Sequence, residues 1–263
     1  MRSLGIATGA FILMAAMRPP GMAEAAEIRV LASGALKLAL TQLIPDFQKA
    51  SSDTVTIGYG PAGSIAKRVQ DGDAADVAIV TLPQLENLES QSKIIQGSRV
   101  DIAGIAIGVA IRKGAPKPDI STVEAFKRAL LSARSIGYRD PATGSTSGIY
   151  TAAMLDRLGI AKDLQPRIKL DSSEGARPED VFQGLVKGEV EMQIGQITEI
   201  VLAPDVDFAG PLPAEIQKVT LLTAGIVATS KEPKAAKAFI DFLSSPSTAL
   251  VLKANGFQPA SKN

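Results

Sequence analysis

The chain has 263 residues, no cysteine, no histidine and no tryptophan, and a formal net charge of +1 at pH 7. Without cysteine or histidine it can form no disulfide, no Ser-His-Asp triad, no cysteine nucleophile and none of the usual zinc sites. Any proton chemistry falls to Asp, Glu, Lys, Tyr or water. The near balance of charges gives no support for a nucleic-acid partner or an anionic membrane surface.

The first residues predict an export signal over residues 1–25. Arg2 precedes an apolar run over residues 4–17, and Ala23-Glu24-Ala25 has the small-residue spacing of a cleavage site. The run is shorter than the roughly 18 apolar residues that indicate a spanning helix. We therefore expect cleavage near Ala25, a periplasmic location and no membrane insertion after cleavage. An uncleaved membrane anchor is the alternative.

Strand and helix patterns alternate along the rest of the chain. Short β-rich segments over residues 28–31, 54–60 and 75–80 are separated by helical patterns, of which the first carries Pro45 as an expected break or kink. This alternation predicts an α/β fold with a mainly parallel sheet. Two longer β-rich runs, residues 102–114 and 218–229, enclose a separate αβ block. We expect two lobes joined by two crossing strands: residues 26–104 plus 227–263, and residues 105–226.

Three turns rich in small polar residues follow predicted strands. They read ASGA at residues 32–35, GPAGS at 60–64 and TGSTSG at 143–148, and each precedes a helix. Small side chains let a ligand approach backbone N–H groups, and a helix N-terminus favours negative charge. Ligands of open α/β sheets bind outside the carboxyl ends of strands. The turns therefore predict an anion pocket that includes Ser33, Gly34, Ala35, Ala62, Gly63, Ser64, Ser147 and Gly148; ordinary helix caps or a surface linker are the alternatives.

Several segments together resemble one family. These are EIRVLASGALKLAL, GYGPAGSIAKRVQDGDAADVAIV, RDPATGSTSGIYTAAML, GLVKGEVEMQIG and AAKAFIDFLSSPSTALVLKANGFQPA. They are similar to periplasmic solute-binding proteins of the molybdate-binding type. The resemblance implies a two-lobed type II periplasmic-binding-protein fold that is monomeric, closes on its ligand in the cleft between the lobes and delivers it to an ABC transporter permease. It implies no metal and no cofactor.

The ligand contacts of molybdate binders do not all carry over. Their two serine hydroxyls fall on Ala35 and Ala62, each with a serine two places away, and their first backbone donor falls on Ser147. Their second backbone donor falls near Pro178, which has no N–H, and beside Arg177. Their tyrosine falls on Gln196. A guanidinium matches a carboxylate in a bidentate way, so a site with Arg177 and Gln196 favours a carboxylate over molybdate.

DPATGSTSG together with GQITEI also resembles a branch that includes the periplasmic aconitate isomerases. Such enzymes move a proton across an allylic carbon of a tricarboxylate without a cofactor. The residues that could neutralise carboxylates are Lys67, Arg68, Arg139 and Arg177, and the candidate bases are Glu174, Glu199 and Tyr150.

Each of these residues also has a structural interpretation. Lys67 and Arg68 could be solvated, Arg139 could pair locally with Asp140, Tyr150 could pack, and Glu199 could face solvent. The primary hypothesis is an exported receptor for a small anion. A cofactor-free isomerase is the alternative, and an adaptor that binds only proteins is a third class.

Overall fold

The computed structural model describes residues 25–143, 145–172 and 181–260. The expected signal peptide and the candidate residues Glu174 and Arg177 lie outside the described residues. No helix in these ranges is long and apolar enough to cross a membrane.

One mixed sheet runs through the whole molecule, in the order β2-β1-β3-β9-β4-β7-β5-β6. In the first lobe β1 is parallel to β2 and β3. These strands are β1 (Glu27–Ser33), β2 (Thr54–Gly60) and β3 (Val77–Thr81). In the second lobe β5 is parallel to β6 and β7. These are β5 (Ile136–Arg139), β6 (Ile168–Asp171) and β7 (Met192–Gln196).

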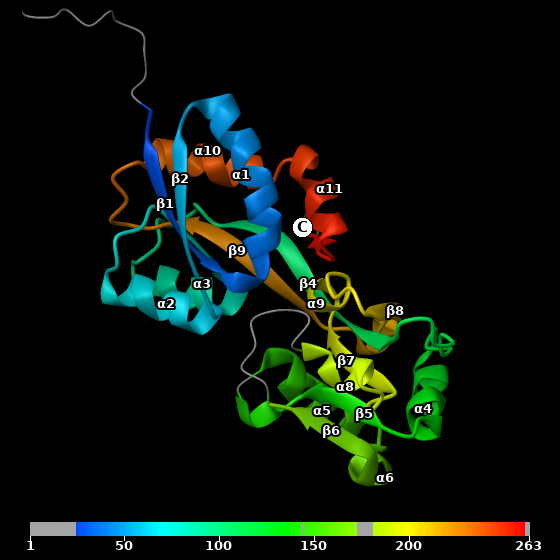
Figure 1. Ribbon diagram of the computed structural model, residues 1–263. Helices are drawn as coiled ribbons and strands as arrows, with labels where there is room; N and C mark the ends of the chain where they lie inside the picture. The colour runs from blue at the N-terminus through cyan, green and yellow to red at the C-terminus, as the bar shows by residue number, and fades with distance from the viewer. Residues whose placement is uncertain (1–24, 144, 173–180, 261–263) are drawn as a thin grey trace, which may run out of the picture.

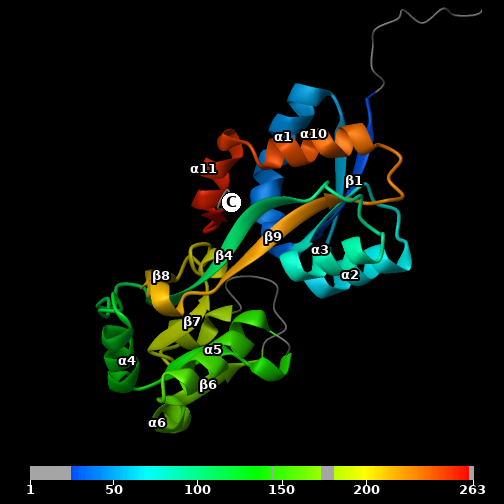
Figure 2. The same cartoon turned by 180° about the vertical axis from the view of Figure 1, so that it is seen from behind.

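Two long antiparallel strands, β4 (Val100–Arg112) and β9 (Val219–Ile226), connect the lobes. Figure 2 shows them running together from one lobe to the other. Ile105 on β4 belongs to the core of the first lobe, and Ile107 belongs to that of the second. Beyond this point β4 pairs with β7 and with the edge strand β8 (Val206–Pro211). The two crossing strands of the predicted fold are therefore confirmed.

Helices cover both faces of the sheet in the first lobe. Helices α1 (Lys37–Ser51), α10 (Pro233–Leu243) and α11 (Pro246–Ala254) bury apolar side chains on one face, where the Phe47 and Phe239 rings meet edge to face at 5.1 Å. Helices α2 (Ala62–Asp71) and α3 (Leu82–Ser90) pack on the other. Such apolar burial stabilises the fold by about 25 cal/mol per Å².

The second lobe has the same layering. Helices α4 (Val123–Ser132), α5 (Thr146–Arg157) and α6 (Ala161–Leu164) contribute Phe126, Leu130 and Met154 to one core. Phe182, with α8 (Gln183–Val186) and α9 (Ile197–Ile200), forms a core on the other face. Both lobes are thus helix-covered α/β layers, as predicted.

Three local features differ from the sequence prediction. Helix α1 continues through Pro45 to Ser51, because Leu40, Leu43 and Phe47 remain buried on one face. Helix α2 begins at Ala62, so the second glycine-containing turn supplies its first residues. Helix α3 was not predicted; it begins with a capping box in which Thr81 and Gln84 satisfy each other's backbone groups.

The strand registers place the carboxyl ends of both parallel sets at the junction of the lobes. Thr81, the last residue of β3, is paired with Leu222 on β9. Gln196, the last residue of β7, is paired with Ile107 on β4, where that strand passes between the cores. The turns predicted to bind a ligand therefore face the junction from both sides.

Candidate functional site

A cavity of about 760 Å³ lies between the two lobes and the crossing strand β9. Its walls come from the start of α2, the β3–α3 turn, the start of α5 and the start of β9. Figure 1 shows α2 and α3 in one lobe and α5 in the other, with β9 running between the lobes. The residues that line it are Pro61, Ala62, Gly63, Ser64, Thr81, Leu82, Pro83, Gln84, Thr146, Lys218, Val219, Thr220 and Leu221.

The first two predicted turns lie side by side in the first lobe. Ser33 on β1 is in register with Gly60 on β2, and the Cβ position of Gly34 lies 3.7 Å from the Gly60 carbonyl oxygen. Ala62, Gly63 and Ser64 line the cavity, whereas Ser33, Gly34 and Ala35 lie next to it without being among its lining residues. Ser33 is buried.

Two residues that the sequence analysis missed complete this wall. The Gln84 side-chain oxygen accepts hydrogen bonds from the Thr81 backbone N–H at 3.2 Å and from the Thr81 hydroxyl at 2.8 Å. This pair orients the Gln84 amide toward Gly63, whose Cβ position is 3.6 Å from Gln84 Nε2. A threonine followed three residues later by glutamine, directly after the buried run over residues 75–80, was the signal available in the sequence.

The third turn forms the start of α5 in the second lobe. Ser145, not Ser147, is the N-cap: its hydroxyl accepts the Gly148 N–H at 3.3 Å, and its carbonyl accepts the Ile149 N–H at 2.9 Å. Ser147 is buried, with its hydroxyl 3.2 Å from that of Ser145. A helix leaves its first N–H groups without intrahelical partners. The N–H groups of Thr146 and Ser147 belong to this first turn, and Thr146 lines the cavity.

Gly148 allows α5 to approach β5 closely. A Cβ atom at this position would overlap the carbonyl oxygen of Arg139, the last residue of β5. The position is buried and lies in the first turn of α5. Glycine is thus required here for backbone packing, which sets the position of the N–H groups at the start of α5.

Beneath this turn, a cluster of charged side chains lies at the ends of β5, β6 and β7. Arg139 on β5 forms an ion pair at 3.7 Å with Asp171, its register partner on β6, and not with its chain neighbour Asp140. The Arg139 and Asp171 side chains are only 16% and 20% exposed. Gln196 is the N-cap of α9, and Glu199 follows in its first turn. None of these residues is among those that line the cavity.

Glu199 differs from the sequence expectation, because its carboxylate is buried instead of facing solvent. Its Oε2 atom is fully enclosed and has no hydrogen-bond partner among the described residues. Burial is the largest effect and raises the pKa of Glu199, and the Asp171 charge raises it further. The Arg139 charge and the hydrogen bond from the Gln196 backbone N–H lower it. The net result is a raised pKa. The apolar ITEIVL stretch gave no sign of this burial, which depends on Arg139 and Asp171 from distant strands.

Other predicted candidates have structural roles. Lys67 pairs with Asp71 at 2.9 Å and Arg68 with Asp73 at 2.7 Å, and none of the four is among the residues that line the cavity. The Tyr150 hydroxyl donates to the Ile216 carbonyl at 2.7 Å. A base role for Tyr150 and a ligand role for the α2 cations are therefore not supported.

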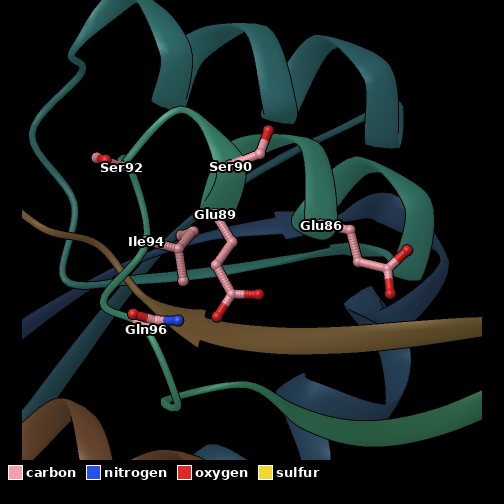
Figure 3. A pocket seen from close by; sticks show the side chains of 6 residues that line it. All are labelled: Glu86, Glu89, Ser90, Ser92, Ile94 and Gln96. Carbon is pink, nitrogen blue, oxygen red and sulfur yellow. The ribbon is translucent and has the colours of Figure 1, made fainter.

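A second cavity, of about 480 Å³, lies in the first lobe at the end of α3 (Figure 3). The Glu89 side chain extends toward Gln96 there, and Arg99 pairs with Glu86 at 3.0 Å and with Glu89 at 3.6 Å. These carboxylates are neutralised by the protein itself, and the described residues contain no group of three or more side chains suited to a metal ion. This cavity is therefore not part of the candidate site.

The chain has the two-lobed type II periplasmic-binding-protein fold, with a cavity between its lobes. The family model described as bacterial extracellular solute-binding protein matches residues 28–258, and the chain belongs to this family.

Among curated relatives, the chain is 31% identical over 242 residues to an aconitate isomerase of Pseudomonas sp, covering 88% of this chain and 87% of that protein. It is 24% identical over 242 residues to the molybdate-binding protein ModA of Escherichia coli, covering 90% of each.

Solved structures show the same fold at lower identity. The Azotobacter vinelandii periplasmic molybdate-binding protein superposes with a TM-score of 0.64 at 20% identity, covering 89% of this chain and 100% of that one. The sulfate-binding protein SubI of Mycobacterium tuberculosis superposes with a TM-score of 0.66 at 18% identity, covering 90% of this chain and 88% of that one.

Proposed function

We propose that the protein captures a small carboxylate anion in the interlobe cavity. One observation carries this proposal. The starts of α2 and α5, from different lobes, border the same cavity, and none of the described residues that line it is acidic. Two helix N-termini attract negative charge, and an anion between them would draw the lobes together by hinge closure.

Carboxylate is favoured over a tetrahedral oxyanion by the residues on offer. Gln196 replaces the tyrosine of the molybdate binders, and Arg177 accompanies a proline where they have a backbone donor. The aconitate isomerase relative supports the same ligand class. The proposed contacts are Ser33, Gly34, Ala35, Ala62, Gly63, Ser64, Ser147, Gly148, Arg177 and Gln196. The protein would act as a periplasmic monomer that hands its ligand to an ABC transporter permease, with lobe limits near residues 104 and 227.

Calorimetric titration tests the ligand class. We expect the mature protein to bind trans-aconitate or citrate at least about tenfold more tightly than molybdate or sulfate, a difference of about 1.4 kcal/mol. Neutral glycerol serves as the control for polyol binding. Tighter binding of molybdate would contradict the carboxylate proposal.

A second candidate function, cofactor-free isomerisation of a tricarboxylate, is favoured by the buried Glu199. A carboxylate with a raised pKa is a stronger base, and the adjacent Arg139 could offset negative charge that develops on the substrate. In this reaction the base takes a proton from the methylene carbon, the electron pair spreads over the allylic system, and a proton returns to the other end. The named relative supports this class.

Glu199→Gln tests whether the enclosed carboxylate lowers the stability of the fold, as expected of a group that is kept for chemistry and not for folding. The folded state raises the pKa above the ordinary 4.5, so native stability is highest below that value and falls as pH rises through the folded pKa. We therefore expect Glu199→Gln to be more stable than wild type by about 1 kcal/mol near pH 7 and by little near pH 4. Urea unfolding at both pH values measures this.

The same variant tests the chemistry. If the protein is an isomerase, a proton NMR time course should show cis-aconitate forming from trans-aconitate with wild type and not with Glu199→Gln. Glu189→Gln, an exposed acid in the same lobe, is the matched control and should change neither property. Equal stability of the Glu199 variant and wild type at both pH values would refute the stability argument.

A further inference from the structure

Lys218 is the only charged side chain among the described residues that line the interlobe cavity. It directly precedes β9 and is exposed, and it shares the cavity wall with Val219, Thr220 and Leu221. Ser64 of the first lobe and Thr146 of the second line the same space. No sequence signal indicates a site at Lys218, because KVTLLTAGIVAT predicts only a strand.

The Lys218 ammonium group lies near an aromatic ring and not near an acid. Its Nζ atom is 5.4 Å from the centroid of the Tyr150 ring, and it forms no ion pair with a carboxylate of the described residues. A cation over a ring face is attracted by the ring quadrupole, but the ring does not neutralise its charge. Tyr150 belongs to α5, so this contact holds the ammonium near the second lobe's helix start.

Both partners of this contact are anchored to the backbone. The Tyr150 hydroxyl donates to the Ile216 carbonyl, two residues before Lys218. The Gln217 side chain accepts the N–H groups of Ile107 at 2.9 Å and Lys218 at 3.0 Å, and donates to the Ile107 carbonyl at 2.8 Å. The backbone of Lys218 is therefore held where the two crossing strands pass between the lobes.

We propose that Lys218 pairs with one carboxylate group of the ligand and so selects anions with two or more carboxylates. This inference rests on the proposed binding function and deepens it. The helix starts of α2 and α5 would hold one carboxylate by N–H groups, and the Lys218 ammonium would hold another as a point charge. A monocarboxylate cannot occupy both positions and would bind without the contribution of Lys218.

Calorimetric titrations of trans-aconitate and of the monocarboxylate crotonate test this. We expect Lys218→Met to weaken trans-aconitate binding about tenfold or more and to change crotonate binding by less than about twofold. Lys218→Arg should retain trans-aconitate affinity within about threefold, because it keeps the charge. The slope of affinity against salt concentration should also fall in Lys218→Met.

The chain offers a matched control on the same ring. The Arg157 guanidinium lies 5.3 Å from the Tyr150 ring centroid but is not among the residues that line the cavity. Arg157→Met should therefore leave trans-aconitate affinity within about twofold of wild type. An equal loss in Arg157→Met and Lys218→Met would overturn the inference, because it would trace the effect to Tyr150 packing.

The remaining outcomes separate this inference from the proposed function. If wild type binds trans-aconitate and Lys218→Met binds it equally well, the inference is overturned and carboxylate capture stands. If wild type binds no carboxylate, both the Lys218 inference and the proposed carboxylate capture are overturned. Thermal melting of each variant shows that it is folded, and the exposed position of Lys218 predicts an unchanged melting temperature.

Discussion

Gly148→Ala is expected to lower the melting temperature by about 6–12 °C, which corresponds to about 3 kcal/mol for a domain of this size. The new Cβ atom would overlap the Arg139 carbonyl oxygen, so α5 must move away from the end of β5. Since backbone atoms on both elements are involved, no side-chain rotation can relieve the overlap.

The displacement should also reduce ligand affinity. The N–H groups of Thr146 and Ser147 move with the start of α5, and an anion held by these groups loses its geometry. We expect carboxylate binding to weaken by about tenfold or more, measured by titration at a temperature where the variant is folded.

Gly63→Ala is the matched control for folding, because it also lies in the first turn of a helix that borders the cavity. Its added Cβ atom would meet only the Gln84 amide nitrogen at an ordinary 3.6 Å, so its melting temperature should not fall. If Gly148→Ala melts within about 2 °C of wild type, the close approach of α5 to β5 is not needed.

Asp76→Ala is expected to cost about 3 kcal/mol of folding free energy without changing ligand affinity. Asp76 is only 5% exposed and accepts the Arg29 N–H at 2.9 Å and the Ser230 hydroxyl at 2.7 Å. It also accepts the N–H groups of Lys231 and Glu232 just before α10. Removing the buried carboxylate would leave these four donors without this acceptor. Asp76 directly precedes β3, whose opposite end, Thr81, lines the cavity.

The pH dependence of stability follows from the same contacts. Burial raises the pKa of Asp76, but the hydrogen bonds from Arg29, Ser230, Glu232 and Lys231 lower it below the ordinary 3.8. The stabilisation is therefore present above that value and is lost as pH falls through the folded pKa. Urea unfolding should show a smaller loss of stability below about pH 4 for Asp76→Ala than for wild type.

Asp71→Ala is the control for Asp76→Ala. The Asp71 side chain is 53% exposed and pairs with Lys67 on the surface of α2. Exposed ion pairs contribute little, so its removal should change stability by less than about 1 kcal/mol. If Asp76→Ala destabilises the protein no more than Asp71→Ala does, the hydrogen bonds to the Asp76 carboxylate contribute little to folding.

Much of the fold could be predicted because the signals are local. The buried run that contains β3, the helix pair α10 and α11 and the two long β-rich runs each show their periodicity within a few turns of chain. Pro233 and Pro246 mark the starts of these two helices in the sequence. Helix α3 was missed because it is short and follows the strand without a loop.

The candidate site was only partly predictable. Ala62, Gly63 and Ser64 were identified from turn composition, since glycine and serine before a helix indicate accessible backbone N–H groups. The N-cap of α5 could not be assigned from the sequence, because TGSTSG offers several hydroxyls and only the backbone geometry selects Ser145.

The sequence by itself determined the layered α/β architecture, the small-residue turns at strand ends and the absence of any histidine or cysteine chemistry. These properties depend on the types and spacing of residues that are close along the chain. Only the tertiary structure decided that Lys218 enters the interlobe cavity and that Glu199 is buried beside Arg139 and Asp171. Exposure and electrostatic environment are properties of strand pairing and lobe contacts, which bring together residues far apart in sequence.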